Sequence, residues 1–292
     1  MWKYWINAFC KHAKFIGVIG FICTFFSDLP IFKWLCFFAL LVVVEIILNF
    51  PLIKCSILQM IGIVKVEKKY GQDIPSIENY KSEVQYDLPF EGEWTVVNGC
   101  FTKDFSHSWE IPTQRYAYDF LILDENGKSN RNQIKNVTDY YCYDQPILAP
   151  ADGVVEAIVN NAEDSVIIGK GRFFRRSSHI AGNYILLKHN ENEYSMLAHL
   201  KKDSIVIEVG EKVHRGQKIA TCGNTGNSTE PHLHFQLQTG RSFYYSAGLP
   251  IRFSKVNLSM PSNYKNIDPR PNMDISKVPD GLITRGYNVS NK

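Results

Sequence analysis

The chain has 292 residues, of which 45% are hydrophobic, and it carries a formal net charge of +3 at pH 7. So small a net charge does not indicate a nucleic-acid-binding protein. The seven cysteines show no local pairing pattern, which argues against a framework of disulfides.

Residues 1–65 are strongly apolar and predict a membrane anchor with one or two transmembrane helices. A bilayer-spanning helix needs about 20 mainly apolar residues. The run at 34–50 reaches that length with its flanks despite Glu45, whereas the run at 15–26 spans only if it recruits residues before Lys14. A cleavable signal peptide is not expected, because no short charged region with a small-residue cleavage site precedes the two runs. The alternative is a buried hairpin in a soluble core.

Residues 66–93 are polar and charged and predict a tether of modest length. From 94 to 240 the sequence predicts a mainly antiparallel β-domain, because short β-branched and aromatic runs alternate with Gly, Asn, Asp and Pro turns. Residues 241–292, with several prolines and few apolar runs, predict an extended tail packed on that domain. The expected strands are 94–97, 117–122, 154–159, 165–168, 184–187, 205–207, 218–221 and 232–238.

A glycine-rich polar loop, residues 223–231, runs into an alternating strand that carries His232 and His234. Side chains two apart on a strand project from one face, and imidazole nitrogen is the commonest metal ligand. The pair suggests a metal site, although two surface histidines on a half-buried strand would give the same pattern.

Two upstream residues are also of types that occur at metal centres. His199 ends the short apolar strand 194–200. Asp119 lies inside a run that otherwise indicates a buried strand, where a lone charge is costly unless it is paired or bound to a metal. Each has a plain alternative, His199 as a strand-end residue and Asp119 as a partner for Arg115. Together with the downstream histidines, these residues indicate a metal centre.

Five ordered segments resemble the lysostaphin-type (LytM-like) peptidoglycan zinc metalloendopeptidases over about residues 95–240. They are residues 145–155, 182–189, 196–200, 209–220 and 223–235. The resemblance implies a bacterial β-sheet metallopeptidase that hydrolyses peptide cross-links of peptidoglycan through a metal-activated water. Carried over by position, it implies that Asp119 and His234 bind Zn2+ and that His199 and His232 are catalytic.

The sequence departs from this family at one ligand. The family's first ligand usually lies four residues before the aspartate, where this chain has Arg115, and arginine has no lone pair to give a metal. The nearest upstream histidine is His107. The loop after it is long enough to fold back beside the strand of Asp119, and this arrangement resembles that of one branch of the family. We therefore expect His107 to be the third ligand. The alternative is a damaged site that cannot hold zinc.

Zinc held by His107, Asp119 and His234 would leave a fourth position for water and lower the pKa of that water to roughly 7. His232 is expected to pass the proton to the leaving amine, and His199 to orient the water or to stabilise the oxyanion. The sequence does not decide which of these two histidines is the general base.

The remaining polar features are expected to be structural or solvated. His189 ends a strand, His214 lies in a turn, and Cys222 is expected to be a small buried residue. A segment that has no counterpart in the family pattern contains His179 and a basic cluster. The cluster is either a solvated face or a contact for an anionic wall polymer, and it comprises Lys170, Arg172, Arg175 and Arg176.

The resemblance implies peptidoglycan stem or cross-bridge peptides as substrate, and hence an extracytoplasmic domain on a bacterial cell membrane. A two-span hairpin would put both chain ends on one side, and the nearby lysines would favour the cytoplasm. A single span at 34–50 would place the domain outside, and the substrate rather than the charges favours it. The alternative functions are an inactive family member that binds the wall or regulates a hydrolase, and a protease that acts on proteins or bacteriocin-like peptides.

Overall fold

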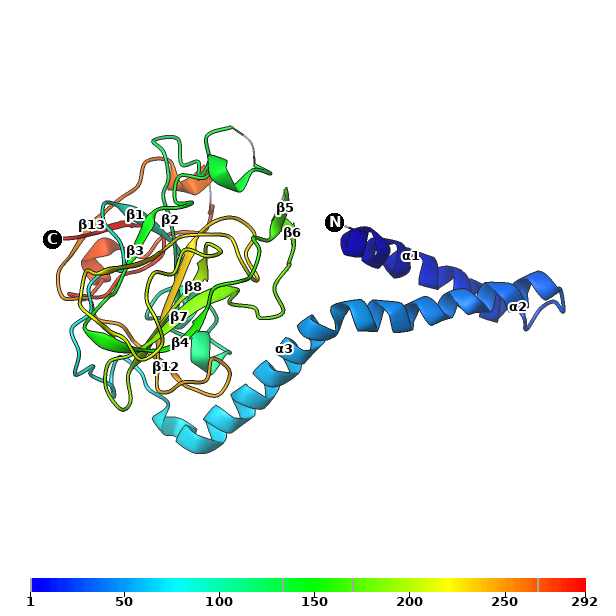
Figure 1. Ribbon diagram of the computed structural model, residues 1–292, viewed down its shortest axis with the longest axis horizontal. Coiled ribbons are helices and arrows are strands. Elements are labelled where there is room, and N and C mark those ends of the chain that lie inside the picture. The colour runs from blue at the N-terminus through cyan, green and yellow to red at the C-terminus, as the bar shows by residue number, and fades with distance from the viewer. Residues whose placement is uncertain (1, 133, 170, 267) are drawn as a thin grey trace. The chain divides into compact units, whose positions relative to one another are not determined.

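The computed structural model describes residues 2–132, 134–169, 171–266 and 268–292, with side chains from residue 5 onward. The chain divides into two compact units, residues 1–57 and 58–292. Figure 1 shows the helical N-terminal part in blue and cyan and the β-domain in the later colours.

The N-terminal unit contains two helical segments that run antiparallel. Helix α1 (Trp2–Cys23) packs on α2 (Pro30–Cys36), a short 3-10 turn at Phe37–Leu40 follows, and α3 (Leu41–Tyr70) continues into the second unit. Pro30 stands in the first turn of α2, where its missing N–H costs nothing. Gly17 allows the close approach, since a Cβ there would lie 2.2 Å from the Ala39 backbone nitrogen.

Two polar pairs fix the register of this hairpin. Lys14 Nζ lies 2.6 Å from a Glu45 carboxylate oxygen, and Asn49 Nδ2 donates to Asn7 Oδ1 at 2.7 Å. Two stretches are long and apolar enough to cross a membrane, Trp5–Cys23 and Pro30–Asp73. The first stretch includes residues before Lys14, so the run at 15–26 gains the length that a membrane span requires.

The second unit is built on one large antiparallel sheet, which confirms the predicted fold class. Among the described residues the strands follow the order β13-β14-β1-β2-β11-β8-β7-β4-β9, and β12 pairs with β11. Two small ribbons, β3 with β10 and β5 with β6, complete the unit. The strands are β1 (Trp94–Asn98), β2 (Tyr118–Leu121), β3 (Pro146–Leu148), β4 (Gly153–Val159), β5 (Val166–Gly169), β6 (Arg172–Phe174), β7 (Asn183–Lys188), β8 (Tyr194–Leu200), β9 (Lys212–Val213), β10 (Lys218–Thr221), β11 (Leu233–Gln238), β12 (Gly248–Leu249), β13 (Val256–Ser259) and β14 (Asn288–Asn291).

One face of the sheet centre is apolar, and the other is polar at β2 and β11 but carries a second apolar cluster with Met196 and Ala198 of β8. Alternate residues of β2, β8 and β11 such as Phe120, Leu197 and Phe235 are buried in the main core. The residues between them therefore project to the opposite face. Strand β11 lies between β2 and β8, which brings polar side chains from three distant parts of the sequence together.

One expected strand does not form. Residues 205–207 lie in an irregular segment, although Ile207 is buried in the core and Ile205 packs against it. Val206 makes a single backbone contact with β10 here, since its N–H donates to Ile219 O. An apolar run of three residues can fill a core position from a loop as well as from a strand, which explains the difference.

The structure differs from the expected tether at 66–93. Helix α3 continues to Tyr70, and Tyr86, Leu88 and Phe90 are fully buried in the main core of the β-domain. The polar residues around these three side chains gave the segment the composition of a linker. The alternation of its apolar residues was the signal of a packed segment.

The buried carboxylate of Glu193 holds this segment on the domain. It accepts hydrogen bonds from the Tyr80, Tyr86 and Ser82 hydroxyls at 2.7 Å and from the Glu83 N–H at 2.9 Å. Burial alone would raise the pKa of Glu193, but hydrogen bonds from Ser82, Tyr86 and Tyr80 outweigh it and lower the pKa.

The expected C-terminal tail contributes strands to the sheet. Strand β14 pairs with β1, and β13 pairs with β14. The segment between them carries Arg285, which is buried and donates to Asp268 Oδ2 at 2.6 Å. Such short strands at a sheet edge are hard to recognise in a proline-rich sequence, because pairing with the rest of the sheet defines them.

We expect Glu193→Gln to lower the free energy of unfolding by about 1–3 kcal/mol at pH 7, because a charged hydrogen-bond acceptor is lost. A carboxyl with a lowered folded-state pKa stabilises the protein above its ordinary value of 4.5 and loses that contribution as the pH falls. The stabilities of wild type and variant should therefore converge in acid. Denaturation as a function of pH measures this effect.

Glu191→Gln is the matched control, since the Glu191 side chain is 86% exposed. It should change stability by less than about 0.5 kcal/mol. A Glu193→Gln curve that stays parallel to that of wild type down to pH 3 would contradict the assigned role of the carboxylate.

Candidate metal centre

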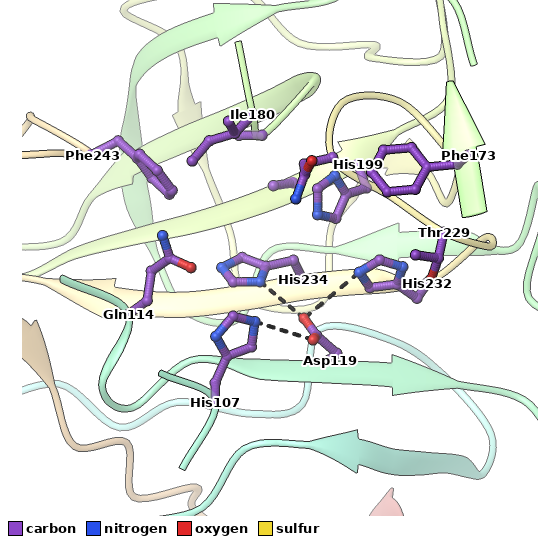
Figure 2. A pocket seen from close by; sticks show the side chains of 13 residues that line it. His107, Gln114, Asp119, Phe173, Ile180, His199, Thr229, His232, His234 and Phe243 are labelled. Carbon is purple, nitrogen blue, oxygen red and sulfur yellow. Dashed lines mark hydrogen bonds and ion pairs between the residues drawn. The ribbon is translucent and has the colours of Figure 1, made fainter. Parts of the chain in front are cut away.

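Asp119 and His234 are direct neighbours across the pairing of β2 with β11. Both project from the polar face of the sheet, and His234 Nδ1 lies 2.9 Å from Asp119 Oδ1 (Figure 2). The strand register thus places one imidazole nitrogen beside one carboxylate oxygen without any loop rearrangement.

His107 reaches the same point from a loop. Its Nε2 lies 3.2 Å from Asp119 Oδ2 (Figure 2). The loop is held back against the start of β2, because the Ser106 hydroxyl donates to Arg115 O at 2.6 Å. The Arg115 side chain donates to Trp109 O at 3.1 Å and stacks on the Trp109 ring at 4.7 Å. Arg115 therefore braces the loop that carries His107 and is not the partner of Asp119.

The three side chains have the chemistry and the spacing of a zinc site. Their ligand atoms lie within 4.8 Å of one another, and two imidazoles with one carboxylate are a donor set typical of catalytic zinc. Burial by itself raises the pKa of Asp119, but the charge and hydrogen bond of His107, with His234 and His232, outweigh it and hold the pKa well below 3.8. The carboxylate is thus ionised, as a ligand must be.

Gln236 is a supporting residue that the sequence analysis missed. Its Oε1 lies 2.9 Å from His234 Nε2 and can accept that N–H, which leaves the Nδ1 lone pair for a metal. Gln236 Nε2 donates to Gln238 Oε1 at 2.7 Å, and Gln238 Nε2 donates to Gly240 O at 2.6 Å. The signal was present in the sequence, because His234, Gln236 and Gln238 recur at every second position.

His232 stands beside these three side chains, and one of its ring nitrogens is hydrogen-bonded. Its Nδ1 lies 2.8 Å from Glu230 O, which accepts the N–H, and its Nε2 lies 3.7 Å from Asp119 Oδ1 (Figure 2). The expected strand began at this residue, whereas β11 begins at Leu233. With Nδ1 bound to this carbonyl, Nε2 is the ring nitrogen that faces the site.

His199 completes the group from β8. Its Nδ1 lies 2.7 Å from Thr225 O, and its ring centroid is 4.6 Å from that of His232. The β7–β8 register slips at this point and His199 has φ 61°, a left-handed conformation that few non-glycine residues adopt and that is enriched at functional sites. Burial, with the charges of His232 and His234, lowers the pKa of His199 well below 6.5, so the ring is neutral at pH 7.

The glycine-rich loop before β11 requires glycine where it approaches another segment. Gly226 has φ 80°, and a Cβ there would lie 2.4 Å from the Gly182 nitrogen. This packing places Thr225 O against His199 and Ser228 Oγ 3.1 Å from His232 Nδ1. The loop thus orients both histidines.

The four histidines and Asp119 line a pocket of about 220 Å³. Figure 2 shows the rings of His107, His232 and His234 around the Asp119 carboxylate, with His199 beside Phe173 on the side of the apolar residues. These apolar wall residues were not foreseen, because they come from loops and from the short strand β6 and carry no chemical signature. They are Phe173, Ile180 and Phe243.

The other polar residues lie outside this group. The His214 side chain is 84% exposed, as expected for a turn. His189 is a structural residue, with Nδ1 2.7 Å from Asp152 O and Nε2 2.7 Å from Ser195 Oγ. Cys222 is buried, as expected.

In the basic cluster, Lys170 lies outside the described residues, while Arg172 and Arg176 are exposed and Arg175 is half-buried. The neighbouring His179 packs on aromatic rings instead of facing solvent. Burial, with the charge of Arg175, lowers the pKa of His179 to about 4.

Residues 135–245 match Peptidase family M23. The chain contains an M23 peptidase domain. This confirms the family resemblance that the sequence suggested, and the match includes His199, His232 and His234. His107 and Asp119 precede the matched residues, so their place in the site comes from the structure.

Relatives of the M23 domain include enzymes and an activator. The peptidoglycan DD-endopeptidase ShyA of Vibrio cholerae is 38% identical over 88 residues, which are 30% of this chain and 18% of that protein. The murein hydrolase activator NlpD of Escherichia coli is 42% identical over 146 residues, which are 50% of this chain and 32% of that protein. The chain thus matches about a third or less of the length of these relatives.

Two solved structures are also similar. A zinc containing peptidase from Vibrio cholerae has 23% identity and a TM-score of 0.34, over 57% of this chain and 41% of that chain. The catalytic domain of lysostaphin from Staphylococcus simulans has 22% identity and a TM-score of 0.30, over 59% and 90% respectively.

We expect Gln236→Leu to weaken zinc binding by about 10–100-fold, because the hydrogen bond that orients His234 is lost. Gln236→Glu keeps an acceptor at this position and should retain most of the affinity. Titration of the purified protein against a competing chelator measures both. Gln145→Leu, at an exposed position, is the control, and equal affinities for Gln236→Leu and this control would contradict the role.

Proposed function

We propose that the chain is a membrane-anchored zinc metalloendopeptidase that hydrolyses peptide cross-links of bacterial peptidoglycan. The observation that carries this proposal is the convergence of His107, Asp119 and His234, with ligand atoms within 4.8 Å of one another, beside two further histidines. The relative ShyA, named a peptidoglycan DD-endopeptidase, supports the substrate class.

In this proposal His107 Nε2, Asp119 and His234 Nδ1 hold the zinc ion. The bound metal supplies a Lewis acid that activates water and polarises the peptide carbonyl. Asp119 has a second task, because its two oxygens contact His234 and His107 separately and keep both rings in place.

His232 is the proposed general acid–base. With its Nδ1–H donated to Glu230 O, its Nε2 can take a proton from the attacking water, and the carbonyl stabilises the resulting imidazolium. The same Nε2 then returns the proton to the leaving amine.

His199 is proposed to orient the attacking water. Its Nδ1–H is donated to Thr225 O, so the neutral ring offers Nε2 as an acceptor and not as a donor to an oxyanion. Of the two roles that the sequence left open, this geometry favours orienting the water over stabilising the oxyanion.

The membrane location is part of the proposal. The hairpin of α1 with the later helices, fixed by Lys14 with Glu45, favours two spans, which put both ends of the anchor on the same side. Because the proposed substrate lies outside the cytoplasm, we place both ends on the extracytoplasmic face, against the tendency of the nearby lysines to face the cytoplasm.

A second candidate function rests on the relative NlpD, named a murein hydrolase activator, whose match covers half of this chain. In that case the domain would bind the wall or regulate another hydrolase without cleaving peptide bonds. The metal content and the activity of the purified protein separate the two functions.

We expect the purified full-length protein to contain about one zinc ion per chain, and His107→Ala and His234→Ala to lose most of it together with wall hydrolysis. His214→Ala should keep both, because His214 is exposed and outside the site. Metal analysis by mass spectrometry provides the test. Full zinc retention in His107→Ala would refute the assignment of this ligand.

We expect His232→Ala and His199→Ala to keep their zinc and to lose about 10²–10⁴-fold in the rate of wall hydrolysis, the usual contribution of a proton-transferring or orienting group. Release of peptides from purified peptidoglycan, followed by chromatography, measures the rate.

Casein serves as a comparison substrate. Cleavage of casein but not of peptidoglycan would show a general protease. A wild-type protein that holds zinc but cleaves neither would support the regulatory alternative.

A further inference from the structure

We propose that residues 58–70, the end of helix α3, position one wall of the substrate pocket. The wall is carried by residues 239–247, which follow β11 and are named here the rim loop. The helix that continues the membrane anchor would thereby set the shape of the site. The substrate in this inference is that of the proposed function.

The end of α3 meets the rim loop at three places along one side. A Cβ on Gly62 would lie 1.9 Å from Tyr244 O, so only glycine permits this approach. Lys65 Nζ lies 4.3 Å from the centre of the Tyr245 ring, a cation–π contact. One turn further on, the Tyr70 hydroxyl donates to Thr239 Oγ1 at 3.2 Å.

The opposite side of the same turns is free of such packing. Met60 and Val64 are 67% and 64% exposed, whereas Val66, on the packed side, is 1% exposed. Residues spaced three or four apart share one face of a helix, so Gly62, Val66 and Tyr70 form a single contact face. The contact is therefore specific to one side of α3.

Residues 58–70 need not lie in the bilayer. The apolar stretch Pro30–Asp73 contains 44 residues, about twice the length that a single span requires. The portion before residue 58 is long enough to cross the membrane by itself, which leaves the end of α3 to pack on the β-domain.

The rim loop transmits this contact to the pocket. Phe243, next to the Tyr244 carbonyl that meets Gly62, lines the pocket. The His179 ring packs against Phe243 at 5.5 Å and against Tyr244 at 5.7 Å. Ile180, which follows His179, lines the pocket next to Phe243 (Figure 2). A shift of Tyr244 would therefore move apolar side chains on both loops.

Such a shift should move the proposed metal ligands less than the pocket wall. Asp119 and His234 are fixed by the pairing of β2 with β11, and the rim loop begins only after β11 ends at Gln238. Displacing the loop should therefore impair substrate binding more than zinc binding or the chemical step. Gly62 is a positioning residue in this sense.

Gly62→Ala is the direct test, since it adds one methyl group toward Tyr244 O while it raises helix propensity. Val64→Ala, on the exposed side of the same turn, is the matched control. Hydrogen exchange of the full-length protein in detergent should show faster exchange in Gly62→Ala at rim-loop amides, by about tenfold. The reporters are Thr239, Ser246 and Ala247, whose N–H groups donate within the loop.

Kinetics on a cross-linked wall peptide should show a KM raised several-fold in Gly62→Ala, with kcat within about twofold of wild type and zinc content unchanged. Phe243→Ala should raise KM similarly, and the double variant should be no worse than either single variant, because both act through one contact. Tyr70→Phe, which removes only the bond to Thr239, provides a milder second variant with faster exchange at Thr239 and Ala247.

Exchange rates in Gly62→Ala and Tyr70→Phe equal to those in Val64→Ala would overturn the inference. So would a loss of kcat or zinc with KM unchanged, or additive effects of Gly62→Ala and Phe243→Ala. Hydrogen exchange needs no substrate, so it tests the positioning of the rim loop even if the chain proves not to hydrolyse peptidoglycan.

Discussion

The pairing of β2 with β11 is the constraint on which the site depends. It places Asp119 directly opposite His234, and the Asp119 carboxylate then contacts three of the four histidines in the pocket. The other faces of both strands are buried in the core, so a slip of one residue in either strand would turn its Asp119 or His234 side chain into apolar surroundings. The chemistry of the site is therefore tied to the stability of the sheet.

His107, the third proposed ligand, is held in place from a loop. Arg115 occupies the position where the family usually has a histidine, and here it braces Trp109, two residues after His107. A residue that cannot bind a metal thus fixes the loop that carries the proposed ligand. Gln236 acts in the same way on His234, because its amide oxygen fixes which ring nitrogen carries the proton.

The sequence predicted the sheet class and the segments that carry the site, because the alternation at 232–238 and the buried aspartate at 119 are local signals. It predicted a tether at 66–93 although Tyr86 and Phe90 are core residues, because polar residues surround their alternation and the Glu193 partner of Tyr86 lies far along the chain. Nor could it identify Phe243 as a pocket residue, because that place results from packing against distant residues such as Met196 and Ala198. Local patterns specify strands and ligand types, whereas long-range packing decides which loops surround them.

Anomalous diffraction at the zinc absorption edge, from crystals of the full-length protein, tests the central claim most directly. We expect a single strong peak at about 2.0–2.2 Å from His107 Nε2, an Asp119 oxygen and His234 Nδ1. No peak in the presence of zinc, or a peak bound by other side chains with His107 turned away, would contradict the account.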